Sequence, residues 1–116
     1  MALATVLLAS CARRDDVRVR VTSAGGAGAA PVENVTVFVG GSKSWWPSIA
    51  AGETVSVVLS PEGEPPETTM TYTTSGRRHD WRGPALAKGR GHLIAIEVAP
   101  DGTATERHCS TPCSLP

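Results

Sequence analysis

Aromatic residues are scarce in this chain of 116 residues, and neither sign of charge is in excess. One Phe, one Tyr and three Trp leave aliphatic side chains to fill most of any hydrophobic core. Eleven basic residues balance eleven acidic residues, so the formal net charge is zero. Nucleic-acid binding depends on concentrated positive charge, and no basic stripe or phosphate-binding motif provides it here. We therefore expect no nucleic-acid partner.

Long helices are also missing from the pattern. Apolar residues nowhere recur at spacings of three and four over ten residues, so no substantial helix is expected. The apolar run from Ala2 to Ser10 is too short to cross a bilayer as a helix. A chain of this length has room for one domain with one core.

Short strand-like segments alternate with turn signals along the rest of the chain. The segment Val17–Thr22 alternates apolar and polar residues with a period of two, which is typical of a strand with one buried face. Six further segments have strand character: 35–39, 53–59, 68–74, 78–82, 92–99 and 103–107. Parallel strands need long crossover connections, usually helical, so we expect antiparallel pairing. The sequence predicts an all-β antiparallel sandwich of about seven short strands, immunoglobulin-like in architecture, with a small β-barrel as the alternative.

Several local features refine this prediction. Ser75-Gly76 predicts a hairpin turn, and Pro100-Asp101-Gly102 predicts a tight turn. The stretch from Lys43 to Gly52 is less regular and is expected to lie between strands. Met70 and Tyr72 should face inward. With its motifs at 34–37, 49–54 and 100–102, the chain resembles small secreted β-sandwich domains of bacteria, a resemblance that implies a fold and no activity.

The first residues carry a separate signal. The sequence Leu8-Ala9-Ser10-Cys11 follows an apolar run and resembles the bacterial lipobox, in which a signal peptide is removed before a Cys that receives lipid. The resemblance implies lipid attachment at Cys11. Ala12 after it implies an outer-membrane lipoprotein that faces the periplasm, in the bacterial cell envelope, or else a secreted protein.

These observations divide the chain into four parts. We expect a signal-peptide-like segment at 1–10, a lipidated tether at 11–16, a β-sandwich domain at 17–108 and a tail at 109–116. Cys109 and Cys113 should close the tail with a disulfide, because neighbouring thiols usually join in an oxidising compartment. A copper or zinc site formed by His108, Cys109 and Cys113 is the alternative, since thiolates suit both metals. No complete ligand set surrounds this tail, so no metal or other cofactor is expected.

Catalytic patterns are missing as well. The sequence contains no Gly-x-Ser-x-Gly elbow and no Ser-x-x-Lys motif, so a nucleophile with its base is not evident. The three histidines follow Arg or Gly in expected turns and strand ends, where solvated side chains are usual. We expect no enzyme activity.

Binding is therefore the expected role. The candidate interaction surface combines aromatic rings with guanidinium groups: Trp45, Trp46, Arg77, Arg78 and Trp81. Because aromatics are few, one Trp should fill the core, and we expect Trp46 inside and Trp45 outside. The expected function is that of a lipid-anchored binding or accessory module that docks a protein partner in the cell envelope. It would contact the membrane through the lipid anchor only.

A second function remains open at this point. Ser75-Gly76-Arg77 and Leu86-Ala87-Lys88-Gly89 resemble loops of bacterial lysozyme inhibitors, which are small, exported and rich in β-strands. The resemblance implies an envelope inhibitor or immunity protein that blocks an incoming enzyme.

Overall fold

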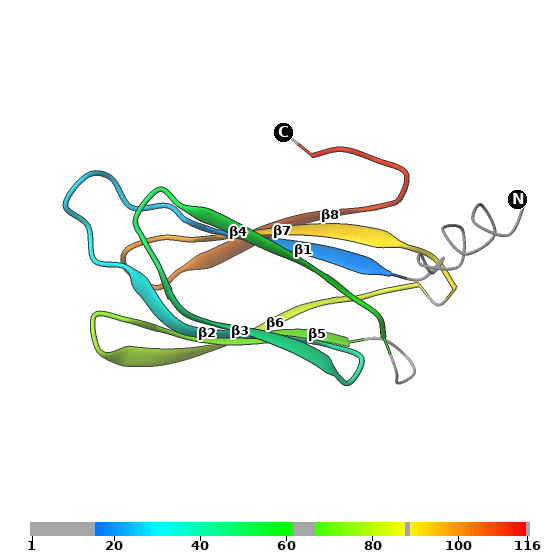
Figure 1. The fold of residues 1–116 in the computed structure, drawn as a ribbon, viewed down its shortest axis with the longest axis horizontal. Coiled ribbons are helices and arrows are strands. Elements are labelled where there is room, and N and C mark those ends of the chain that lie inside the picture. Colours follow the sequence, from blue (N-terminus) through cyan, green and yellow to red (C-terminus); the bar gives the residue numbers. More distant parts are fainter. Residues whose placement is uncertain (1–15, 62–66, 88, 116) are drawn as a thin grey trace, which may run out of the picture.

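The computed structural model describes residues 16–61, 67–87 and 89–115. Its eight strands form two four-stranded sheets that stack as the layers of a sandwich and do not close into a barrel (Figure 1). Sheet A has the order β4-β1-β7-β8, and sheet B has the order β3-β2-β5-β6. No residue in the described ranges is helical. The strands are β1 (Val17–Ser23), β2 (Val32–Val39), β3 (Ser42–Ile49), β4 (Thr54–Leu59), β5 (Glu67–Thr74), β6 (Arg77–Ala85), β7 (His92–Val98) and β8 (Ala104–Ser110).

The predicted sandwich of about seven strands is confirmed, with β3 as the additional strand in the stretch that the sequence suggested was irregular. Pro47 and two adjacent tryptophans obscure its period-two pattern. β3 lies at the edge of sheet B, where a proline need not donate a hydrogen bond to a neighbouring strand. β6 is also longer than expected, with nine residues.

One pairing in sheet A departs from the expected antiparallel order. β1 pairs with β7 in parallel, whereas the other described strand pairs are antiparallel. Five strands separate β1 from β7 in the chain. The long crossover that a parallel pair requires is therefore made of strands, four of them in sheet B and one, β4, in sheet A, and no helix is needed.

The core lies between the sheets and is mainly aliphatic. β1 buries its three valines and turns its two arginines outward, as its alternation predicts. Met70 and Tyr72 of β5 face inward as predicted, with 0% and 3% of their surface exposed. The turns at Ser75-Gly76 and at 100–102 are confirmed, and each has a glycine with positive φ.

The structure describes the C-terminal boundary of the predicted sandwich domain but not the predicted segments at the N-terminus. β8 continues to Ser110, so the sandwich extends beyond residue 108 and includes Cys109. The segment 1–10, Cys11 and the tether up to residue 15 lie outside the described residues. Within the described ranges, no helix is long and apolar enough to cross a membrane.

Candidate functional site

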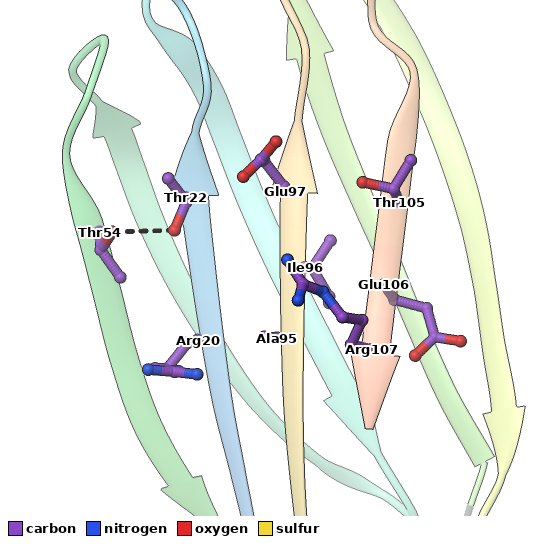
Figure 2. A pocket seen from close by; sticks show the side chains of 9 residues that line it. All are labelled: Arg20, Thr22, Thr54, Ala95, Ile96, Glu97, Thr105, Glu106 and Arg107. Carbon is purple, nitrogen blue, oxygen red and sulfur yellow. Dashed lines mark hydrogen bonds between the residues drawn. The ribbon is translucent and has the colours of Figure 1, made fainter. Parts of the chain in front are cut away.

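The outer face of sheet A contains a hollow at its centre. Arg20 of β1 lies opposite Ala95 of β7, and Ala95 lies opposite Arg107 of β8. Two strand spacings, about 10 Å, separate the backbones that carry the two arginines. Because the side chain between them is only a methyl group, the sheet surface sinks into a hollow of about 360 Å³ (Figure 2). The register of three strands therefore builds a depression with a cationic group on each side.

The next row of the sheet adds a carboxylate and hydroxyl groups. Glu97 of β7 lies between Thr22 of β1 and Thr105 of β8, and all three line the same hollow. Thr22 and Thr54 are joined by a hydrogen bond of 2.8 Å between their Oγ1 atoms. Figure 2 shows Arg107 reaching from β8 across β7, towards the side of the hollow on which β1 lies. The lining is accordingly polar and carries both signs of charge.

These charges have no partners within the described part of the chain. Neither Arg20, Arg107 nor Glu97 forms an ion pair or a side-chain hydrogen bond there. The Nε atom of Arg20 is in addition buried without a hydrogen-bond partner, an arrangement that costs free energy. Arg18 of β1 also points outward, so the outer face of sheet A carries three guanidiniums. One carboxylate, that of Glu97, points outward from the strands among them. Glu106 of β8 also lines the hollow, so around this face the guanidiniums exceed the carboxylates by one.

The C-terminal tail bounds this face at one end. Cys109 and Cys113 form the predicted disulfide, with an S–S distance of 1.97 Å. Residues 111–115 turn back over sheet A (Figure 1) and, with Arg20 and Leu93, line a second hollow of about 400 Å³. Leu93 belongs to the outer face, yet only 8% of its surface is exposed. The tail therefore covers an apolar side chain and bounds the second hollow, which shares Arg20 with the first.

Sheet B has a different outer face. Trp45 of β3 and Phe38 of β2 are 59% and 36% exposed. Trp45 lies opposite Thr36, and Phe38 lies opposite Lys43, so the two rings are diagonal neighbours on adjacent strands. We call these four residues the aromatic patch.

The three tryptophans of the predicted interaction surface do not share one face. Trp45 points outward, whereas the side chain of Trp46 is partly buried and packs against the core. Trp81 also packs against the core, because it lies opposite the buried Met70 in the register of β5 and β6. Its indole ring lies over Gly83, where any Cβ would approach the ring to 2.4 Å. Of the three rings, only Trp45 is mainly exposed.

The two arginines of that predicted surface are exposed on β6. Arg78 forms an ion pair of 3.5 Å with Asp80, and both side chains are about three-quarters exposed, at 73% and 75%. An ion pair in water contributes little to stability. Arg78 is on the outer face of sheet B, opposite Thr73, while Arg77 adjoins the hairpin turn. Two strands, β2 and β5, separate them from β3 and thus from Trp45.

A polar cluster ties the two sheets together at one end. Tyr72 donates its hydroxyl proton to the carbonyl of Gly102 at 2.7 Å. The ring of Tyr72 stacks on that of His79, with centroids 5.1 Å apart, and Nε2 of His79 lies 2.8 Å from Oγ1 of Thr74. Burial, followed by the nearby Asp101 carboxylate, raises the pKa of Tyr72. The cluster joins β5 and β6 to the turn between β7 and β8.

The expectation of solvated histidines is wrong for His92, whereas His108 is exposed on β8. His92 is 5% exposed, and its Nε2 lies 3.2 Å from the carbonyl oxygen of Ala87. Nδ1 of His108 lies 3.0 Å from a carboxylate oxygen of Glu106. His108 and Cys109 point to opposite faces of β8, and the Cys109 sulfur is part of the disulfide. Within the described residues, no group of three His, Cys, Asp or Glu side chains is placed to hold a metal ion.

Comparison with known proteins defines a fold class and no family. No family model and no curated protein sequence matches this chain. The NMR structure of a protein from Eubacterium rectale is similar, with a TM-score of 0.50 and 12% identity over 80% of this chain and 85% of that one. This similarity concerns the β-sandwich fold alone. Suilysin, a cytotoxin of Streptococcus suis, aligns over 88% of this chain and 24% of its own at 9% identity, but its TM-score of 0.39 supports no inference.

Proposed function

We propose that this chain is a lipid-anchored accessory module of the bacterial cell envelope, one that docks a protein partner through the aromatic patch and catalyses no reaction. The observation that carries this proposal is the exposure of Trp45, at 59%, beside the partly exposed Phe38. Tryptophan is the residue most enriched at the energetic centres of protein interfaces. The envelope location rests on the lipobox-like sequence that ends at Cys11.

The surroundings of Trp45 support a docking role. Its neighbour Trp46 packs against the core, so the chain already buries a ring at this point and does not need Trp45 for stability. Thr36 and Lys43 flank the two exposed rings with polar groups. An apolar centre with a polar border is the usual organisation of a protein interface.

Site-specific photo-crosslinking in bacterial cells tests the docking surface. A photoreactive amino acid at position 45 should yield a discrete crosslinked protein complex. The matched control is Val58, which is 50% exposed on the opposite sheet and should yield none. Equal crosslinking from both positions, or none from either, would contradict the proposal.

A Trp45→Ala variant then measures the contribution of the ring. We expect the affinity for the crosslinked partner to fall by about 30-fold or more, as for a residue at the centre of an interface. The free energy of unfolding should change by less than about 0.5 kcal/mol, because the side chain is exposed. Trp46→Ala is the contrasting variant, since it removes core packing and should lower stability.

The proposed lipid anchor has its own test. Wild-type protein should be found in the membrane fraction with a mass increased by acyl groups, and Cys11→Ser should release it. An unmodified wild-type mass would remove the anchor from the proposal and leave the docking surface to be judged by crosslinking.

The positions of the two segments that resemble lysozyme-inhibitor loops do not support the inhibitor alternative. The turn at 75–76 precedes β6 and the loop at 86–91 follows it, so a nine-residue strand separates them. This corresponds to about 30 Å of extended chain. Lys88 lies outside the described residues. The copper or zinc alternative would first require reduction of the disulfide, because both thiol sulfurs are used in it.

A further inference from the structure

The hollow over Ala95 has properties that stability does not explain (Figure 2). Arg20 and Arg107 flank it without ion-pair partners in the described part of the chain, and Nε of Arg20 is buried and unpaired. A buried donor without an acceptor weakens a fold. Arg20 and Ala95 lie on the two central strands of sheet A, which are the most rigidly held part of a four-stranded sheet. This combination is what a preformed ligand site requires.

From this arrangement we propose that the hollow binds the phosphate group of a small ligand between Arg20 and Arg107. We further propose that Glu97 accepts a hydrogen bond from an ammonium or hydroxyl group of the same ligand. The site is separate from the aromatic patch, which lies on the other sheet, and it does not depend on the docking proposal.

The number of donors favours phosphate over a carboxylate. Each guanidinium presents five N–H donors, and one guanidinium is enough to bind one carboxylate through two hydrogen bonds. A phosphate monoester carries more charge and three terminal acceptor oxygens. A phosphodiester, as in a lipid headgroup, keeps two terminal oxygens on a tetrahedral phosphorus. The terminal oxygens of either group point in different directions, so either can accept from two guanidiniums on opposite sides. Arg18 and Arg20 also line the adjoining hollow beside the tail, which adds to the positive charge.

Glu97 restricts the ligand further. Its carboxylate and that of Glu106 both line the hollow and would repel a simple anion. Glu97 lies two residues from Ala95 on the central strand β7, which corresponds to about 7 Å along the strand. A ligand with a donor a few bonds from its phosphate would place that donor near Glu97 while the phosphate contacts the arginines. Phosphoethanolamine is the simplest probe with this arrangement.

Calorimetric titration of the full chain tests the proposal with three probes: phosphoethanolamine, inorganic phosphate and ethanolamine. We expect phosphoethanolamine to bind more tightly than inorganic phosphate, and ethanolamine not to bind. Arg20→Gln and Arg107→Gln should each weaken phosphoethanolamine binding by about tenfold or more, because each removes charge-assisted hydrogen bonds. Glu97→Gln should abolish the preference for phosphoethanolamine over phosphate.

The matched control is Arg82→Gln, which makes the same change of charge on an exposed residue of sheet B. It should leave binding unchanged, and circular dichroism should show all four variants folded. No binding of phosphoethanolamine, or an equal loss in the Arg82 and Arg107 variants, would overturn the site. A preference retained in Glu97→Gln would overturn the role of Glu97.

Vesicles distinguish a lipid headgroup from a free phosphate ester. Cys11→Ser protein, which cannot be acylated there, is mixed with phosphatidylethanolamine vesicles and with phosphatidylcholine vesicles. Binding to the first alone, lost in Arg107→Gln, identifies the headgroup as the source of the phosphate. Binding of soluble phosphoethanolamine without either vesicle identifies a free small molecule.

Discussion

The outer faces of the two sheets differ although both arise from the same period-two alternation. Sheet A presents three guanidiniums and two carboxylates around two adjoining hollows, and its tail closes one end. Sheet B presents two aromatic rings beside threonines, with a water-exposed ion pair two strands away. The balanced composition of the chain therefore conceals two surfaces with distinct chemistry, one suited to an anion and one suited to an apolar partner.

The largest expected change in the free energy of unfolding comes from a substitution in the core between the two sheets. Ile94 of β7 is 0% exposed, so Ile94→Ala leaves a cavity and should lower the free energy of unfolding by about 2–5 kcal/mol. Urea unfolding followed by tryptophan fluorescence measures this change. Val58→Ala on the exposed side of β4 is the control and should shift the value by less than about 0.5 kcal/mol. Similar losses in both variants would contradict the assignment of inner and outer faces.

A smaller effect should be confined to sheet A. The double variant Cys109→Ser/Cys113→Ser removes the cross-link of a short loop and should cost about 2 kcal/mol on the chain-entropy estimate. Release of the tail should also expose Leu93, so amides of β7 and β8 near it should exchange faster with solvent. Hydrogen exchange of sheet B should stay as in the wild type. Faster exchange in both sheets would mean that the tail supports the whole sandwich.

The smallest expected effect lies where the two sheets are tied together. Tyr72→Phe removes the hydrogen bond to Gly102, which should cost about 1 kcal/mol at neutral pH. Denaturant unfolding of both proteins at pH 7 measures the difference. A variant as stable as the wild type would show that this hydrogen bond does not stabilise the fold.

The same variant has a pH signature. Because the pKa of Tyr72 is raised in the folded state, its contribution is complete below the unfolded pKa of about 10 and is lost as pH rises through the folded pKa. The unfolded chain releases its proton first, so wild-type stability should fall above pH 10. Tyr72 is the only tyrosine in the chain, so the phenylalanine variant should lack this component. Parallel alkaline decline in both proteins would show that other groups cause it.

Much of the local structure follows from residue order. The alternation in β1 predicts which side chains face the core, and Pro100-Asp101-Gly102 predicts the turn that is found. The edge strand β3 escaped prediction because Pro47 and paired tryptophans break the pattern that marks a strand. The hollow escaped because Arg20, Ala95 and Arg107 come from strands distant in the sequence.

The class of this protein, an all-β sandwich with an aliphatic core and a disulfide in its tail, can be predicted from the order of its residues. These properties depend on the period of the apolar residues and on thiols four residues apart, which are local facts. The parallel pairing of β1 with β7 is visible only in the folded molecule. That pairing sets which side chains of sheet A lie opposite one another. Strand pairing joins distant segments, and a shift of one residue would move every side chain to the other face. For that reason strand register determines the charged hollow and the aromatic patch. It also determines which tryptophans face the core and which one faces outward.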